Sequence, residues 1–264
     1  KYSSVDHKQG LAPYLREYLR GVLTAKEPKE SNYSEWNKQQ YLLDKWQWDN
    51  NPVYGFCEKN HKPDGSKYDL YQDGLKIYTT IDSRMQRYAE EAVDANMQEQ
   101  QKASFKELKR QKNAPFSRDL TQQEVDGIMS RSMRQTERYR LMRKAGISAN
   151  KKKKAFHTPQ DMRLFTYERG LIDTIMSPYD SIRWQKSFLR CGFMSMDPHT
   201  GYVKAYVGGP NFTHFQYDMV TKGRRQVGST VKPYLYTLAM DEGLWPCEKT
   251  INQPITLIDG NGKE

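Results

Sequence analysis

Ser229 and Lys232 are the residues whose types and spacing best suit covalent chemistry. They lie in residues 226–233, which read Gln-Val-Gly-Ser-Thr-Val-Lys-Pro. Residues three apart on a helix share one face, so the lysine amine can reach the serine hydroxyl. A lysine whose pKa is lowered by burial or by a second cation can take the serine proton and leave a nucleophile. The spacing therefore indicates a compact pair of nucleophile and base.

Pro233 sets the position of the helix that carries this pair. Proline is tolerated only in the first turn of a helix, where its missing N–H would have no partner. We therefore expect a helix from Ser229 to about Glu242, with Gly243 just past its end. A serine at a helix N-terminus meets unpaired N–H groups that stabilise developing negative charge. Three apolar residues of this helix are expected to face the core: Leu235, Leu238 and Ala239.

The same spelling occurs a second time, at Ser148 and Lys151. This copy lies beside Gly146 and runs into the lysines of residues 151–154, for which we expect disorder and no apolar helix. Its serine should be solvated and not activated. For Ser229 the alternative interpretation is an ordinary serine that only caps a helix.

The remaining pattern predicts an α+β domain in which an antiparallel sheet packs with helices. Apolar residues at three- and four-residue spacing predict helices, and Asp82 or Ser83 should cap the second of them. Thr121 and Glu124 have the spacing of a capping box. The expected helices lie at residues 11–23, from 83 onward, after 121, and at about 179–189; the expected strands lie at 75–80, 162–167, 171–176, 191–196 and 202–207.

Charge is concentrated in one part of the chain. The 264 residues carry 42 Lys and Arg against 32 Asp and Glu, and residues 102–154 alone hold 16 against 5. This segment is interpreted as a solvated helical insertion, with contact to an acidic partner as the alternative. It lacks the recurring aromatic residues that stack on nucleic-acid bases, so we expect no nucleic acid partner.

Membrane and redox signals are weak in the sequence. No run of about 18 apolar residues is present, so any membrane anchor is expected outside this chain. None of the three cysteines, Cys57, Cys191 and Cys247, forms a Cys-x-x-Cys pair, and all three are interpreted as packing residues.

Several separated motifs occur in a fixed order. They are residues 74–82 (Gly-Leu-Lys-Ile-Tyr-Thr-Thr-Ile-Asp), 197–201 (Asp-Pro-x-x-Gly), 205–209 (Ala-Tyr-Val-Gly-Gly) and 225–233. From about residue 68 to 260 this order resembles the transpeptidase domain of class A penicillin-binding proteins. Residues 10–17 resemble the segment that joins the glycosyltransferase and transpeptidase domains of that family. The style of this segment and of the basic insertion resembles versions from Bacteroides-like bacteria.

The resemblance implies a domain organisation. Residues 1–67 would be the linker between the two domains, and residues 68–264 the N-terminal part of the transpeptidase domain, with a basic insertion at about 102–154. The fold would be an incomplete domain of the penicillin-binding-protein and serine β-lactamase type.

The resemblance also implies a reaction. Ser229 would be acylated by the penultimate D-Ala of a peptidoglycan stem peptide, with Lys232 as proton acceptor, and an amine of a neighbouring stem would then take the acyl group. β-Lactams would acylate the same serine. This ping-pong chemistry needs no metal or organic cofactor. The protein would act at the periplasmic face of the bacterial inner membrane, where residues 102–154 could touch anionic lipid or the sacculus.

The family's second and third motifs are absent from the expected place. No Ser-x-Asn follows Ser229, and no Lys-Thr-Gly occurs in the chain. We therefore expect a fragment that is inactive by itself. Two alternatives stay open: a serine β-lactamase or D,D-carboxypeptidase, which hydrolyses the acyl-enzyme, and a basic binding module that is not an enzyme.

Overall fold

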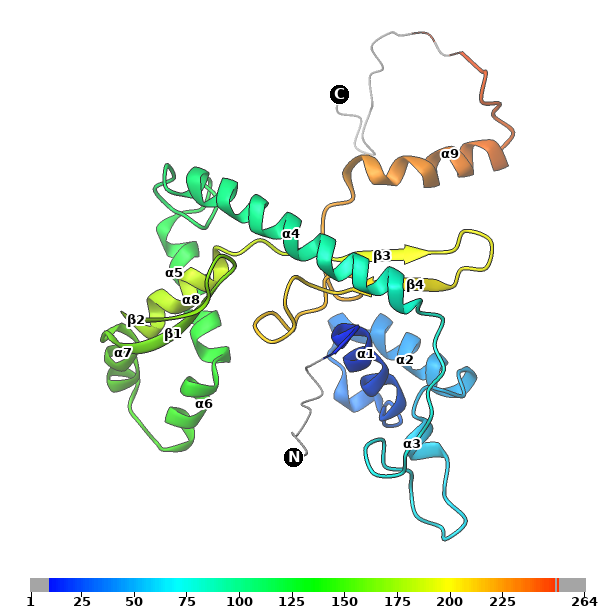
Figure 1. The fold of residues 1–264 in the computed structure, drawn as a ribbon, viewed down its shortest axis with the longest axis horizontal. Helices are drawn as coiled ribbons and strands as arrows, with labels where there is room; N and C mark the ends of the chain where they lie inside the picture. Colours follow the sequence, from blue (N-terminus) through cyan, green and yellow to red (C-terminus); the bar gives the residue numbers. More distant parts are fainter. Residues whose placement is uncertain (1–9, 250, 252–264) are drawn as a thin grey trace. The chain divides into compact units, whose positions relative to one another are not determined.

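The computed structural model describes residues 10–249 and 251, and these divide after Gly223 into two compact units (Figure 1). The first unit combines helices with two small antiparallel sheets, and the described part of the second is a helical segment followed by turns. This is the α+β class predicted from the sequence.

The long helix α4 (Ser83–Leu108) lies along the hairpin of β3 (Phe193–Met196) and β4 (Val203–Val207). Its residue Ala89 packs against Ala205 and Val207 of β4. Asp82 caps it, because the carboxylate accepts the backbone N–H groups of Arg84 and Met85 at 2.9 and 3.1 Å. These bonds favour the ionised form and lower the pKa of Asp82. The predicted helix start and the predicted hairpin are both confirmed.

The strand predicted at residues 75–80 is wrong. This segment has no strand assignment, and Ile77 and Tyr78 are exposed. Only its end approaches β4, where the Thr80 hydroxyl donates to the Val203 carbonyl at 2.7 Å. Alternating β-forming residues make a strand only where a neighbouring strand completes the ladder, and this segment does not run along one.

Helix α1 (Pro13–Leu23) confirms the first predicted helix and contacts the end of β4. Its Tyr14 is 3% exposed and meets Phe212 edge to face, with ring centroids 4.9 Å apart. A Cβ added to Gly208 or Gly209 would lie 2.7 or 2.4 Å from Tyr14. The Gly-Gly of the motif at residues 205–209 is therefore required by the close approach of this tyrosine.

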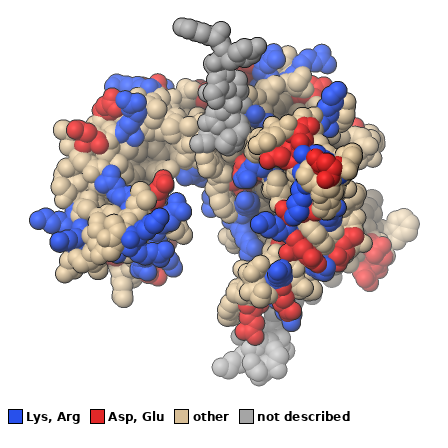
Figure 2. Space-filling model, turned by 90° about the horizontal axis from the view of Figure 1, so that it is seen from below, with Lys and Arg blue, Asp and Glu red and all other residues tan. Residues whose placement is uncertain are grey.

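Three helices, a hairpin and a fourth helix follow α4. They are α5 (Gln122–Gln135), α6 (Glu137–Lys144), α7 (Ala149–His157), β1 (Gln160–Thr166), β2 (Gly170–Met176) and α8 (Pro178–Lys186). Strands β1 and β2 pair in antiparallel register, as predicted. The capping box is also confirmed, since Thr121 and Glu124 bond reciprocally at the start of α5. Lys and Arg side chains gather on part of this region, at the left of Figure 2.

The disorder predicted for residues 151–154 is wrong, because these lysines lie within α7. Phe156 of α7 is 1% exposed and lies near Tyr139 of α6, with ring centroids 6.2 Å apart. Burial of this one aromatic ring holds the helix despite the charge repulsion among its lysines.

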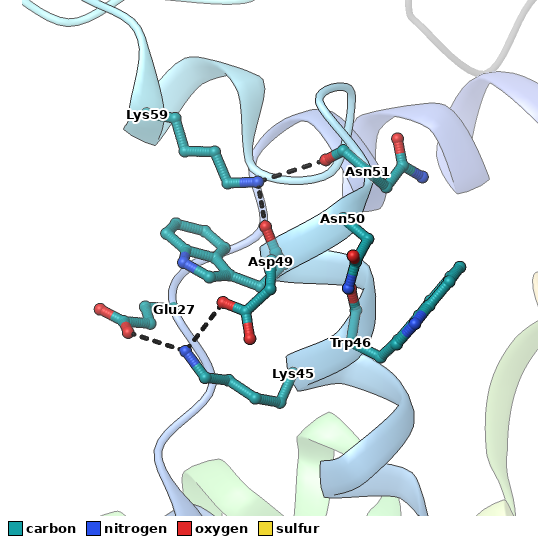
Figure 3. A network of polar contacts seen from close by, with 8 residues as sticks. Glu27, Lys45, Trp46, Asp49, Asn50, Asn51 and Lys59 are labelled. Carbon is teal, nitrogen blue, oxygen red and sulfur yellow. Dashed lines mark hydrogen bonds and ion pairs between the residues drawn. The ribbon is translucent and has the colours of Figure 1, made fainter.

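The segment between α1 and α4 contains α2 (Lys38–Asn50) and α3 (Phe56–Lys59), together with short 3-10 turns at Glu30–Asn32 and Glu35–Asn37. Lys59 joins α3 to α2: its amine lies 4.6 Å from the Trp48 ring centroid and donates to the carbonyls of Trp48 and Asn51 (Figure 3). Lys45 pairs with Asp49 one turn further along α2 and with Glu27 in the irregular segment that follows α1. This segment is thus partly helical.

In the second unit, a 3-10 turn at Gly228–Val231 leads into helix α9 (Lys232–Asp241). Gly243 has φ +95° just past the end of α9, and the N–H of Leu244 donates to the Ala239 carbonyl at 2.9 Å, as predicted for a glycine-terminated helix. The α-helix itself begins three residues later than expected. Leu235 and Leu238 are exposed, so the prediction that they face a core is wrong for this structure. The described part of the second unit holds no other helix or strand for them to pack against.

Candidate active site

Ser229 and Lys232 lie at the two ends of one helical turn. Ser229 is the second residue of the 3-10 turn, and Lys232 is the first residue of α9, with its backbone N–H donating to the Ser229 carbonyl. Side chains three residues apart in a 3-10 turn are nearly eclipsed. The serine and lysine therefore leave the backbone on the same side.

Two neighbouring residues fix this turn. Gly228 has φ +52°, a left-handed conformation that side-chain-bearing residues rarely adopt. Pro233 lies in the first turn of α9, where its ring is compatible with the helix. Proline has no backbone N–H to donate, and in the first turn a helix needs none, so the α-helix cannot begin a full turn earlier without losing a hydrogen bond at this residue. Glycine and proline together place the 3-10 turn that contains Ser229 directly before the α-helix.

Both candidate residues are exposed, and no hydrogen bond joins the Ser229 hydroxyl to the Lys232 amine among the described residues. A lysine acts as a proton acceptor more readily when water is removed from around it. The arrangement thus supplies a nucleophile and an acceptor one turn apart, and any desolvation has to come from groups that cover this surface.

Ser148 lies at the start of α7, where its carbonyl accepts the N–H of Lys152 at 3.0 Å. The helix that follows, α7, is uncapped and basic, so the expectation that no apolar helix follows this serine is confirmed. Its side chain makes no capping hydrogen bond and is exposed, which confirms the expected solvated serine. Position at a helix start is therefore common to both Ser-x-x-Lys copies.

Two buried glutamines on α4 were not identified from the sequence. Gln86 is 0% exposed; its Oε1 accepts the Tyr206 N–H at 2.7 Å and its Nε2 donates to the Tyr206 carbonyl at 2.9 Å. Gln101 likewise bonds to the backbone of the segment after α8: its side-chain amide donates to the Ser187 carbonyl at 3.0 Å and accepts the Leu189 N–H at 2.8 Å. A signal was present, because both glutamines continue the three- and four-residue spacing of the apolar stripe on α4.

A second buried contact fixes the chain just before the second unit. The Tyr206 hydroxyl donates to Asp218 Oδ2 at 2.5 Å, and Asp218 Oδ1 accepts the N–H of Val220 at 2.8 Å. Burial, and then this bond to a carboxylate, raise the pKa of Tyr206 above its usual value. Tyr206 thus connects α4, β4 and the loop that leads to Gly223.

The cysteines differ in their surroundings. Cys57 is buried and Cys191 is half-buried, and burial raises the pKa of both thiols. Cys247 is exposed, so the packing interpretation is wrong for it.

No group of three or more His, Cys, Asp or Glu side chains that could hold a metal ion occurs within residues 10–249 and 251. None of the helices in that part of the chain is long and apolar enough to cross a membrane.

Family models match two adjacent parts of the chain. Residues 111–189 match the penicillin-binding protein middle domain, and residues 191–262 match the penicillin binding protein transpeptidase domain. The second match contains β3, β4 and the Ser229 turn. The first overlaps most of the predicted basic insertion, and the predicted domain boundaries stay a prediction.

Curated relatives agree with these matches. Penicillin-binding protein 1A of Rickettsia prowazekii is 29% identical over 215 residues, which cover 75% of this chain and 27% of that protein. The proteins of the same name from Vibrio cholerae and Escherichia coli are 40% and 41% identical over 67 and 68 residues, covering 25% and 26% of this chain and 8% of each relative.

The chain spans about a quarter of the length of the first of these relatives. No solved structure matches it. Two adjacent family domains, in the order in which the motifs occur, confirm the resemblance seen in the sequence, and the chain therefore belongs to the penicillin-binding protein family.

Proposed function

We propose that residues 191–262 belong to a peptidoglycan D,D-transpeptidase, with Ser229 as nucleophile and Lys232 as proton acceptor. The observation that carries the proposal is the position of this pair: one helical turn apart at the start of α9, inside the match to the transpeptidase domain. The proposed substrates are the D-Ala-D-Ala end of one stem peptide and an amine of a neighbouring stem. The proposed location is the periplasmic face of the inner membrane.

The reaction has two steps. Ser229 Oγ attacks the carbonyl carbon of the penultimate D-Ala, the hydroxyl proton passes to Lys232 Nζ, and the bond to the terminal D-Ala nitrogen breaks as that nitrogen takes up the proton. The acyl group is then an ester on Ser229. An amine of a neighbouring stem attacks this ester, forms the new amide and returns the proton to the serine oxygen. A β-lactam follows the first step and stays attached, because its ring opens without losing a leaving group.

The test is covalent labelling with a fluorescent penicillin, followed by mass spectrometry of the adduct. The full-length gene product should be labelled at Ser229. The 264-residue chain alone should be labelled slowly, because it has no Lys-Thr-Gly, no Ser-x-Asn after Ser229, and a solvent-exposed pair. The resemblance implies that the absent motifs contribute one oxyanion donor, and loss of a single such donor costs about 3 kcal/mol of transition-state stabilisation, so a large rate difference is expected. Rapid labelling of the short chain would show that it needs nothing further.

Product analysis separates transfer from hydrolysis. With a labelled stem peptide and an excess of acceptor amine, a transpeptidase gives the cross-linked product. A β-lactamase or D,D-carboxypeptidase gives the free acid, and a penicillin adduct that disappears within minutes would indicate hydrolysis. Absence of any adduct on the full-length gene product would contradict both enzymatic proposals and favour a binding module.

A further inference from the structure

Helices α6 and α7 carry a concentration of positive charge that acyl transfer at Ser229 does not use. Residues 137–157 contain eight Lys and Arg against one Glu. All of these cations except Lys152 are exposed. Among the described residues, none of the eight lies within ion-pair distance of a carboxylate. Arg138 donates to the neutral Gln160 amide at 3.0 Å, which leaves its charge uncompensated.

Helices α6 and α7 meet at a small contact around Tyr139. Gly146, with φ +69°, lies in the turn between them. The Phe156 ring centroid lies 6.2 Å from that of Tyr139, and the Lys152 amine lies 5.0 Å from the Tyr139 ring centroid. Lys152 is therefore half-buried at this contact, and the other seven cations of the two helices are exposed.

Helix stability does not explain why the lysine run of α7 begins in its first turn, although Lys154 is favourably placed in the last turn. Its first turn contains no acidic residue, and the run at residues 151–154 begins in that turn. The N-terminal end of a helix carries partial positive charge, so cations there are unfavourable and acids favourable. Four adjacent lysines also repel one another. An arrangement that costs stability locally is typical of a surface whose charge is used for binding.

The exposed residue Leu141 indicates which kind of acidic partner fits. It is 60% exposed and lies one turn from Arg138 and one turn from Lys144 on α6. No Tyr, Phe or Trp within residues 137–157 is exposed, and the exposed His157 ring lies against Tyr179 with ring centroids 4.4 Å apart, so this surface is poor in rings that could stack on bases or sugars. An aliphatic side chain between cations suits the edge of a bilayer, where phosphates meet the cations and the acyl region accepts the leucine.

We propose that this surface docks on a bilayer that presents anionic phospholipid headgroups. The surface is called the α6–α7 basic face and consists of Arg138, Arg140, Leu141, Arg143, Lys144, Lys151, Lys153 and Lys154. The contact is independent of acylation at Ser229. It is reversible and weakens as salt shortens the range of the electrostatic attraction.

The first experiment measures co-sedimentation of the complete 264-residue chain with vesicles. Vesicles of phosphatidylcholine and phosphatidylglycerol in equal parts should bind the chain at low salt, and vesicles of phosphatidylcholine alone should not. Replacing Lys151, Lys153 and Lys154 by Gln should weaken binding by about tenfold or more, since each cation near an anionic surface contributes severalfold to the affinity. Replacing the same three by Arg keeps the charge and should preserve binding. Equal binding to both vesicle types would overturn the proposal.

A matched control separates a local surface from net charge. A second triple variant removes three positive charges from exposed lysines outside residues 137–157: Lys29→Gln, Lys38→Gln and Lys102→Gln. Its binding should stay within about twofold of the unchanged chain, because attraction over more than a Debye length is largely screened. An equal loss in both triple variants would show that only total charge matters and would overturn the proposal.

Leu141→Ser tests the lipid assignment itself. The variant should bind phosphatidylglycerol vesicles more weakly, and the deficit should persist at high salt because apolar insertion is not screened. Far-UV circular dichroism and the urea midpoint should match those of the unchanged chain, since Leu141 is exposed. If Leu141→Ser binds as tightly as the unchanged chain, or if DNA or purified sacculi retain the chain more strongly than the vesicles do, the surface is a general polyanion site and the lipid proposal is overturned.

Discussion

The two Ser-x-x-Lys segments of this chain both lie at helix starts, but their surroundings differ. Ser148 precedes α7, which exposes Lys151, Lys153 and Lys154 to solvent and whose one buried residue is Phe156. Ser229 precedes α9, where Lys232 is followed by Pro233 and a run of apolar residues. The first serine begins a basic surface, and the second begins a helix with apolar side chains on several sides.

Neither the four-residue motif nor the position at a helix start is therefore enough to identify a nucleophile. A base lysine has to lose water, and the lysines of α7 are surrounded by like charges that keep water near them. Around Lys232 the neighbours Val231, Tyr234 and Leu235 are apolar and can exclude water once another surface covers them. Ser229 is therefore favoured as the nucleophile by the apolar side chains around Lys232 more than by the four-residue motif.

The largest expected effect separates the two serines directly. In the full-length gene product, Ser229→Ala should reduce acylation by penicillin at least about a thousandfold, because a nucleophile and its base act as one unit. Ser148→Ala should leave the rate unchanged. Mass spectrometry of the tryptic adduct assigns the labelled residue, and an adduct on Ser148 would contradict the whole comparison.

The second prediction separates the two lysines. Lys232→Arg keeps the positive charge but provides a guanidinium that does not give up its proton near neutral pH, so acylation should fall nearly as far as in Ser229→Ala. Lys151→Arg should have no effect on acylation. Stopped-flow measurement of penicillin acylation checks both variants, and full activity of Lys232→Arg would restrict this residue to a charge-stabilising role.

The third prediction compares the burial of one apolar side chain on α7 with that of one on α9. Phe156→Ala should lower the free energy of unfolding of the first unit by about 3–5 kcal/mol, since it empties a buried aromatic position. Leu238→Ala should change the stability of the chain by no more than about 0.5 kcal/mol, because Leu238 is exposed. Urea titration followed by circular dichroism measures both, and a large loss from Leu238→Ala would mean that α9 is packed in solution.

The fourth prediction compares helix starts. Thr121 caps α5 through a reciprocal box with Glu124, whereas the Ser148 side chain makes no capping bond to α7. Thr121→Ala should destabilise the first unit by about 1 kcal/mol. Ser148→Ala should change it by less than about 0.5 kcal/mol, a difference that urea midpoints resolve. Equal losses would indicate that Ser148 caps α7 in solution.

The smallest expected effect is the pH dependence of the α5 cap. The Glu124 carboxylate accepts the Thr121 N–H and hydroxyl, each at 2.8 Å, and these bonds lower the pKa of Glu124. Because the folded pKa lies below the unfolded value of about 4.3, the contribution is complete above that pH and is lost as pH falls through the lowered pKa. Glu124→Gln should therefore be less stable than the unchanged chain at neutral pH, and the gap should narrow in acid. A constant gap from neutral to acid pH would show that the charge is not involved.

Much of the local structure followed from the sequence. Asp82 and Thr121 mark helix starts because their side chains accept nearby backbone N–H groups, an interaction decided within a few residues. The turn at residues 197–201 closes because the Asp197 carboxylate accepts the N–H groups of His199 and Thr200. Pro233 and Gly243 likewise bound α9 through backbone geometry alone.

Features that depend on distant partners could not be predicted in the same way. The strand expected at residues 75–80 lacks a neighbour along its length, and the expected disorder at residues 151–154 ignored the partner that Phe156 finds on α6. The spacing of Gln86 and Gln101 places them on the apolar stripe of α4, but the backbone groups to which they bond are known only once distant segments are placed beside α4.

The family, the α+β class and the candidate pair Ser229 and Lys232 could be inferred without a structure, because motifs in a fixed order and residue spacing are properties of the chain alone. The fold was needed to show that Tyr14 requires the glycines at 208 and 209, that buried glutamines join α4 to distant segments, and that the basic helices expose Leu141 among their cations. The physical reason is that burial and buried hydrogen bonds depend on which distant surfaces meet, whereas caps, turns and periodic spacing act between neighbours in the chain.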